Sequence, residues 1–115
     1  MKLLTHNMLM SPGTRNGYPL GVEAEKVDKT EAEFNGDFMA RMVGKIDYKV
    51  LLSTLASLSV ETTLPPQVPD NFAQDEPFLL GLHHALMEIE VIEGSLVCPE
   101  TGKRFPIKEG IPSLL

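Results

Sequence analysis

The last eighteen residues, Cys98-Pro-Glu-Thr-Gly-Lys-Arg-Phe-Pro-Ile-Lys-Glu-Gly-Ile-Pro-Ser-Leu-Leu115, decide how the chain is organised. They predict a turn rich in proline and glycine, a strand over 104–107, a second turn and an apolar exit. The first turn, 98–102, has the outline of a zinc knuckle in which Thr101 stands where the second cysteine would be. Zinc needs three or four protein ligands, so a knuckle with one cysteine cannot hold it alone.

Composition places the chain among ordinary globular proteins. Its 115 residues are 43% hydrophobic and 23% charged, which is enough for one compact core. A single cysteine excludes an internal disulfide. The N-terminus has polar residues too early for a signal peptide, and no apolar run approaches the roughly 20 residues that span a bilayer. We therefore expect the protein in the cytoplasm and the nucleus.

The charge of the chain argues against independent nucleic-acid binding. The net charge is −6, and residues 21–93 hold fourteen acidic against five basic residues. An acidic protein gains little from the counterion release that drives binding to a phosphate backbone. RNA contact is therefore expected only through a partner, assisted at most by the mildly basic ends.

The first third of the chain reads as strand-rich. Residues 2–10 are apolar on both alternating faces, which indicates a short strand buried on each side. A turn-rich loop follows over 11–17, and the alternation over 18–24 predicts a second strand. Residues 26–33 read as a charged connector.

The middle of the chain predicts three helices over 34–87. Asn35, Asp47 and Asp75 each precede a run of apolar residues at helical spacing and are good N-caps. Three prolines within 62–71 exclude helix there. Beyond the third helix, 88–92 alternates as a half-buried strand, and Glu93-Gly94 predicts a turn that returns 95–98 as a hairpin partner.

This order predicts an α+β fold. Both strand-rich ends are too small to bury a core alone, so we expect residues 1–33 and 88–115 to form one β module together. The helical segment 34–87 is then an insertion into that module.

No catalytic or metal constellation emerges from the residues. Cys98, His6, His83 and His84 are the only soft-metal candidates, and the adjacent histidines point about 100° apart on a helix. We expect one of them to face the core and the other to face solvent or a partner. The glycines match no phosphate or dinucleotide loop, and the neighbouring Glu100 is expected to raise the pKa of the Cys98 thiol.

Six linked blocks resemble the multifunctional methyltransferase subunit family, the small activators of tRNA methyltransferases. They are Met1-Lys-Leu-Leu-Thr-His-Asn-Met-Leu9, Gly17-Tyr-Pro-Leu20, Phe34-Asn-x-x-Phe38, Phe78-Leu-x-x-Leu-His-His-Ala-Leu86, the stretch from Glu90 to Ile107, and Gly110-Ile-Pro112. The resemblance runs in order from end to end. It implies a zinc-ribbon-like β module made from both termini, with a helical domain inserted between.

The resemblance also implies a function. Members of that family are non-catalytic partners that stabilise and activate S-adenosylmethionine-dependent methyltransferases acting on tRNA, ribosomal RNA and a translation release factor. Binding in the family adds a strand to the enzyme's sheet and covers an apolar patch beside it. We expect heterodimers, with the cofactor on the partner and with different partners competing for one edge.

Motif position in the family assigns the expected contact residues. The assigned residues are Thr5, Asn7, Leu9, Phe105, Ile107, Ile111, Pro112 and Leu114. About half of them are expected to fill the small core of the β module instead of meeting a partner.

The chain departs from the zinc-binding members of that family. Residues 10–17 contain no cysteine and Thr101 replaces the partner of Cys98, so zinc binding is not expected and packing must hold the ribbon. Two alternatives stay open. One is an RNA-binding zinc-ribbon remnant acting without an enzyme. The other is a small methyltransferase, which the missing glycine-rich cofactor loop disfavours.

Overall fold

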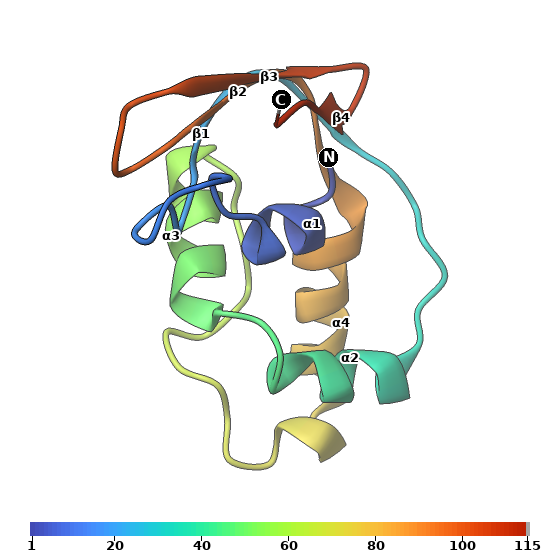
Figure 1. Ribbon diagram of the computed structural model, residues 1–115. Coiled ribbons are helices and arrows are strands. Elements are labelled where there is room, and N and C mark those ends of the chain that lie inside the picture. The colour runs from blue at the N-terminus through green and yellow to red at the C-terminus, as the bar shows by residue number, and fades with distance from the viewer. Residues whose placement is uncertain (115) are drawn as a thin grey trace.

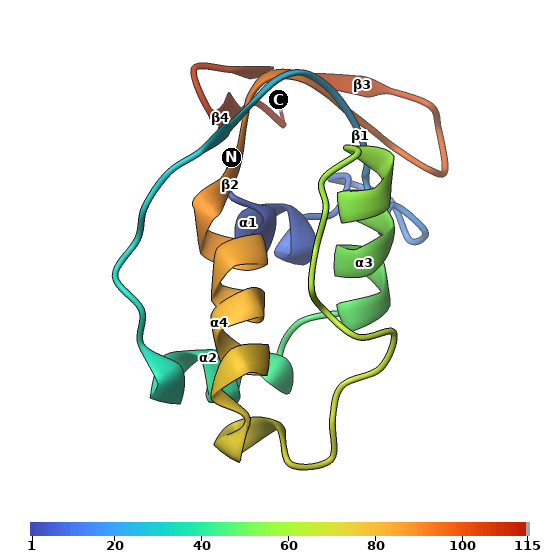
Figure 2. The ribbon, with the colours of Figure 1, turned by 180° about the vertical axis from the view of Figure 1, so that it is seen from behind.

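The computed structural model describes residues 1–114 and shows a mixed α/β fold. Among these residues a four-stranded antiparallel sheet, in the order β1-β2-β3-β4, lies across one end of a group of helices (Figures 1 and 2). The elements in chain order are α1 (Leu3–Met8), β1 (Gly21–Lys29), α2 (Gly36–Val43), α3 (Tyr48–Ser57), the 3-10 turn η1 (Phe72–Gln74), α4 (Glu76–His83), the π-helical segment η2 (His84–Glu88), β2 (Ile89–Val97), β3 (Arg104–Lys108) and β4 (Ile111–Pro112). The coarse α+β prediction is confirmed.

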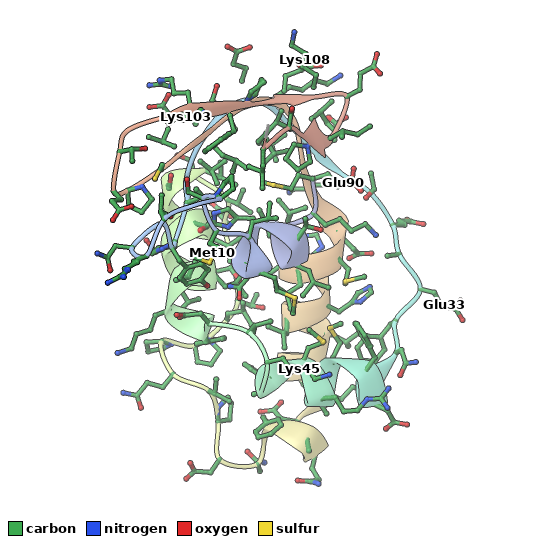
Figure 3. The ribbon with its side chains drawn as sticks, viewed as in Figure 1. Met10, Glu33, Lys45, Glu90, Lys103 and Lys108 are labelled. Atoms are coloured by element: carbon green, nitrogen blue, oxygen red, sulfur yellow. The ribbon has the colours of Figure 1, made fainter. Side chains whose placement is uncertain are left out.

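The sheet buries one face against the helices and exposes the other. Along β3, Phe105 and Ile107 are buried, while the alternate residues Arg104, Pro106 and Lys108 are exposed. This alternation follows from the two-residue period of a strand, which sends successive side chains to opposite faces. In Figure 3 the charged side chain of Lys108 accordingly stands on the outer side of the sheet, away from the helices.

The three predicted helix starts are confirmed in detail. The side-chain oxygens of Asn35, Asp47 and Asp75 accept hydrogen bonds from the backbone N–H groups three residues ahead, at 3.0, 3.2 and 3.1 Å. Each cap satisfies one of the N–H groups that the first turn of a helix leaves without a partner. These helices therefore begin where the sequence predicts.

The predicted strand over 2–10 is wrong beyond its first residues. Lys2 bridges Glu90 in an antiparallel arrangement, but the chain then turns into α1. Leu3, His6 and Asn7 are buried, and this i, i+3, i+4 spacing is that of one helix face. The sequence pattern did not reveal this helix face, because two of its three buried residues, His6 and Asn7, are polar.

The predicted hairpin turn at Glu93-Gly94 is also wrong. β2 runs through these residues as one strand, and Gly94 lies opposite a bulge in β1 after Ala24. A Cβ on Gly94 would lie 2.3 Å from the carbonyl oxygen of Glu23, so glycine here permits a close approach of two strands. β1 also extends to Lys29, which makes strand of half the predicted connector.

Sheet and helices share one hydrophobic core. Its fully buried members come from every part of the chain, including Leu3, Leu20, Met39, Leu51, Leu82, Leu86, Ile89, Leu96, Phe105 and Ile107. The sheet and the helices therefore stabilise each other through common packing. Within residues 1–114 no helix is long and apolar enough to cross a bilayer.

Candidate partner-binding surface

The predicted contact residues divide into an exposed and a buried group. Ile111 is 69% exposed and Thr5 is exposed, while Leu9, Pro112 and Leu114 are partly buried. Asn7, Phe105 and Ile107 are at most 4% exposed. The side chains of Phe105 and Ile107 lie in the hydrophobic core, and the side chain of Asn7 is buried against Asp47. They support the surface from beneath.

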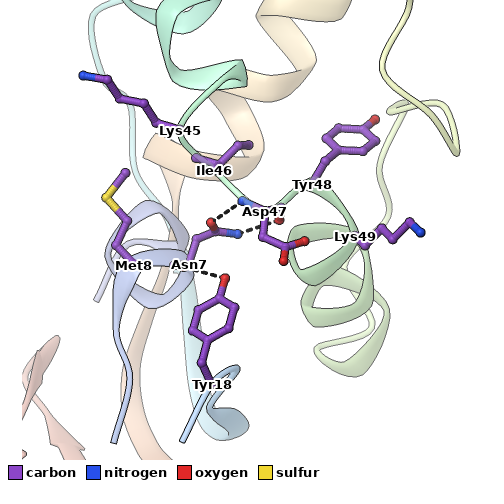
Figure 4. Close-up of a pocket in the computed structure, with 8 residues that line it drawn as sticks. All are labelled: Asn7, Met8, Tyr18, Lys45, Ile46, Asp47, Tyr48 and Lys49. Atoms are coloured by element: carbon purple, nitrogen blue, oxygen red, sulfur yellow. Dashed lines mark hydrogen bonds between the residues drawn. The ribbon is translucent and has the colours of Figure 1, made fainter. Parts of the chain in front are cut away.

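Asn7 joins α1 to the start of α3. Its amide donates to the carbonyl oxygen of Asp47 at 2.8 Å and its side-chain oxygen accepts from the Asp47 N–H at 2.8 Å (Figure 4). The Tyr18 hydroxyl donates to the Asn7 carbonyl oxygen at 2.7 Å. This pair of reciprocal bonds satisfies both backbone groups of Asp47, so α1 is fixed in position relative to α3.

The Asn7 contacts form the floor of an open cleft of about 670 Å³ between α1 and the α2–α3 connection. Its apolar part comes from Met8, which is 52% exposed, and from Ile46. Two lysines, Lys45 and Lys49, stand at its rim (Figure 4). With Asp47, which also lines the cleft, they leave it with one more basic than acidic side chain. The prediction from sequence missed this cleft, because a strand over 2–10 would send Asn7 and Met8 to opposite faces.

The apolar exit forms an edge of the sheet beside the start of α1. β4 pairs with β3 through Ile107–Pro112 and Lys108–Ile111. The Gly110 N–H donates to the Ile92 carbonyl oxygen at 3.0 Å and the Val91 N–H donates to the Met1 carbonyl oxygen at 2.8 Å. These bonds bring the turn before β4 next to the residues that lead into α1, and both elements face the viewer in Figure 1.

The two edges of the sheet differ in how they are protected. The edge strand β1 has a bulge in its pairing with β2, and it carries a run of exposed charged residues, which are Glu23, Glu25, Lys26, Asp28 and Lys29. Bulges and charges of this kind discourage pairing with another strand. β4 has only two residues, and its Ile111 presents an exposed apolar side chain. The β4 edge is thus the one that offers apolar contact beside open backbone.

The knuckle holds its remaining cysteine by hydrogen bonds. Cys98 is 1% exposed, and the Thr101 N–H donates to its sulfur at 3.4 Å. Hydrogen bonds from the Ser11 and Thr101 hydroxyls lower the pKa of the Cys98 thiol to about 7. The expected rise in this pKa is wrong, because these two hydroxyl groups, helped by the backbone N–H groups of Thr101 and Glu100, favour the thiolate.

The residues around the knuckle do not fit a zinc ion. Hydroxyl groups stand where thiolates are required, and across residues 1–114 no cluster of three or more His, Cys, Asp or Glu side chains could hold a metal ion. The histidines have other partners. The ring of His6 is buried and contacts the Leu20 carbonyl oxygen at 2.6 Å, and burial lowers the pKa of His6. His83 faces the core and His84 is partly exposed, as predicted.

Comparison with known proteins decides the family. The family described as Trm112p-like protein matches residues 2–110. This chain belongs to the Trm112p-like family. A relative from Arabidopsis thaliana, multifunctional methyltransferase subunit TRM112 homolog B, is 47% identical over all of this chain and 95% of the relative. The mouse TRM112-like protein is 43% identical over all of this chain and 94% of its own length. TRM112 of Saccharomyces cerevisiae is 30% identical over all of this chain and 96% of its own length.

A solved Trm112 chain supports the fold of this Trm112p-like protein. It comes from a structure of the E. cuniculi Mtq2–Trm112 complex, described as responsible for methylating the eRF1 translation termination factor. The two chains superpose with a TM-score of 0.65 at 24% identity, over 100% of this chain and 95% of the other. The recognition made from the six sequence blocks is confirmed by the family match.

Proposed function

We propose that this chain is a non-catalytic subunit that stabilises and activates S-adenosylmethionine-dependent methyltransferases acting on tRNA, ribosomal RNA and a translation release factor. The observation that carries the proposal is the full-length similarity to multifunctional methyltransferase subunits of plants, mammals and yeast. The catalytic subunit supplies the cofactor site, and this chain supplies a surface. The heterodimer is the active unit.

The proposed docking surface consists of Thr5 and Met8 on α1 together with Ile111 on β4. Thr5 and Met8 are three residues apart, so they lie on the same face of the helix. Ile111 is a large apolar side chain that is 69% exposed, and in a binding surface such residues are the anchors that a partner buries. A strand of the enzyme pairs alongside β4 while its apolar side chains cover Ile111.

The shortness of β4 makes this edge selective. Pro112 has no N–H to donate, so the edge accepts only a brief ladder of hydrogen bonds. Short edges with proline resist indiscriminate pairing of identical chains. Specific binding then depends on the apolar contact at Ile111 and on the neighbouring α1 face. One edge serves one sheet at a time, so we expect different methyltransferases to compete.

Activation follows from mass action. An isolated methyltransferase with an uncovered sheet edge and apolar patch is prone to aggregation. A subunit that binds only the folded enzyme raises its stability in proportion to the logarithm of the subunit concentration over its dissociation constant. The increase in activity then reflects a larger population of folded enzyme.

The finer architecture is part of the same proposal. We infer a zinc-ribbon-like β module from residues 1–33 and 88–115 in which packing replaces the metal, with 34–87 as the inserted helical part. The shared core and the hydrogen bonds around Cys98 support a module that is closed without zinc. Methyltransferases that modify tRNA and ribosomal RNA act in two compartments, so we predict that this subunit is found in both the cytoplasm and the nucleus.

Capture from cell extract tests the proposal. The tagged chain is expected to recover several methyltransferases, and Ile111→Asp should lose them while its own free energy of unfolding changes by less than about 0.5 kcal/mol. Ala73→Asp is the matched control, because it adds the same charge at an exposed site in η1, at the end of the molecule away from the sheet. Recovery of no methyltransferase, or equal recovery by Ile111→Asp, contradicts the proposal.

A further inference from the structure

The helical part comprises residues 36–88. Two segments lead from it into the sheet, and they run along the same side of the molecule. One is the segment 30–35 between β1 and α2, which has neither helix nor strand and which we call the strap. The other is α4 with η2, which continues directly into β2. Both lie on the right of Figure 1 and on the left of Figure 2. Contacts between them decide how firmly the strap is held against α4.

Glu88 pins the strap to the second connection. The Ala32 N–H donates to its Oε2 atom at 3.0 Å, and the Thr30 N–H donates to its backbone carbonyl oxygen at 2.8 Å. The other carboxylate oxygen, Oε1, lies 2.9 Å from Nδ1 of His84. Hydrogen bonds to the Glu88 carboxylate from His84 and Ala32 lower its pKa, so the charged form is the one that the fold favours.

His83 adds a second attachment to the same residue, Ala32. Its Nε2 atom lies 2.9 Å from the Ala32 carbonyl oxygen and 3.7 Å from Oε2 of Glu88. The Phe34 ring meets the His83 ring edge to face, with centroids 5.4 Å apart. Ala32 is therefore held at its N–H by Glu88 and at its C=O by His83. The titratable groups facing the carboxylate are these two histidines, and the strap faces it with backbone groups.

Two features mark this contact as more than ordinary packing. The His83 ring is 4% exposed, and its Nδ1 atom has no hydrogen-bond partner among residues 1–114. An unpaired buried polar atom costs free energy, so the arrangement is not one of maximal stability. Glu88 is also the last residue of the π-helical segment, a rare geometry that inserts an extra residue into a helix and is frequent at functional sites.

We propose that Glu88 and His83 form a latch that holds the strap against α4, and that the strap opens as a local unit while the core stays folded. The latch ties the strap to the end of the α4–η2 segment, just before β2 begins. Opening would release Ala32 and Phe34, while α2, which begins directly after the strap, stays in place because its Met39 and Met42 lie in the core.

Hydrogen exchange at single amides tests the latch in the isolated chain. The Ala32 N–H has the Glu88 carboxylate as its acceptor, so Glu88→Ala should speed its exchange about tenfold or more. Glu88→Gln keeps a neutral acceptor and should give a smaller increase, about threefold, because charge-assisted hydrogen bonds are roughly twice as strong. The control Glu100→Ala makes the same deletion in an exposed turn and should leave Ala32 unchanged.

The amides of Val91 and Leu96 in β2 serve as references for global opening. Faster exchange at Ala32 with unchanged exchange at these two supports the latch. Unchanged exchange at Ala32 in both Glu88 variants overturns it. An equal increase at Ala32, Val91 and Leu96 overturns it as well, because Glu88 would then stabilise the whole fold and not the strap. Glu88→Gln supplies the same comparison where Glu88→Ala does not fold.

Discussion

Replacing Asn7 by alanine tests whether this residue is structural. The substitution removes two side-chain hydrogen bonds of 2.8 Å, one given to and one taken from the peptide groups of Asp47. Each bond of this kind contributes about 1 kcal/mol net, so the free energy of unfolding should fall by about 2 kcal/mol. For a chain of this size that corresponds to a Tm lower by about 8–10 °C.

Urea denaturation followed by circular dichroism measures this effect. The midpoint should fall by roughly 1 M with an unchanged m-value. Thr5→Ala is the control, because Thr5 is exposed on the same helix, and it should change the free energy of unfolding by less than about 0.5 kcal/mol. A loss for Asn7→Ala no greater than that of Thr5→Ala would refute the reasoning and return Asn7 to the set of direct partner contacts.

Three further predictions follow from the same structure. Because the pKa of His6 is lowered in the folded chain, the unfolded chain takes up a proton more readily. The contribution of His6 to the free energy of unfolding is therefore fully present above the ordinary histidine pKa of 6.5 and is lost as the pH falls below that value. His6→Gln should flatten this part of the pH profile of unfolding, and an unchanged profile would contradict the prediction. Phe105→Ala should lower the free energy of unfolding by about 3–5 kcal/mol, because the ring is 1% exposed, and a loss below 1 kcal/mol would show that Phe105 is not core. Reversing the charge of both rim lysines of the cleft, Lys45→Glu with Lys49→Glu, should weaken methyltransferase binding and reduce the salt dependence of that binding. The control is Lys26→Glu, at an exposed lysine away from the cleft, and equal affinities of the two variants would exclude the cleft from the interface.

The parts of the fold set by local chemistry could be predicted from the sequence. Asn35, Asp47 and Asp75 cap their helices because a side-chain oxygen and the first turn lie within three residues of each other. The proline-rich loop and the alternating β3 strand are likewise local. Such features need no knowledge of what packs against them.

The errors arose where distant segments decide the structure. α1 buries His6 and Asn7, whose partners Leu20 and Asp47 lie far along the chain, so its inner face does not read as apolar. Gly94 suggested a turn because a close approach to Glu23 cannot be seen from its neighbours. The same limit applies to the site. Sequence position alone could not separate the exposed Ile111 from the buried Ile107 four residues away.

The turn at 98–103 positions the C-terminal strands of the sheet. The turn at 98–103 survives without a metal because the Cys98 N–H and C=O bond to the backbone of Lys103 and Gly102 at 2.9 Å each. This turn sets the direction of β3, and β3 in turn positions β4 at the edge. The broken knuckle thus still presents Ile111 at the sheet's edge, where we propose that the enzyme binds.

The most direct test of the account is the rate of methyl transfer from S-adenosylmethionine by purified catalytic subunits of the tRNA, ribosomal RNA and release-factor classes. Each subunit is assayed alone, with this chain, and with Ile111→Asp. We predict that the wild-type chain raises the rate until one equivalent is bound, that Ile111→Asp does so only weakly, and that the chain alone transfers no methyl group. Rates unaffected by the chain in all three classes, or methyl transfer by the chain alone, would contradict the account.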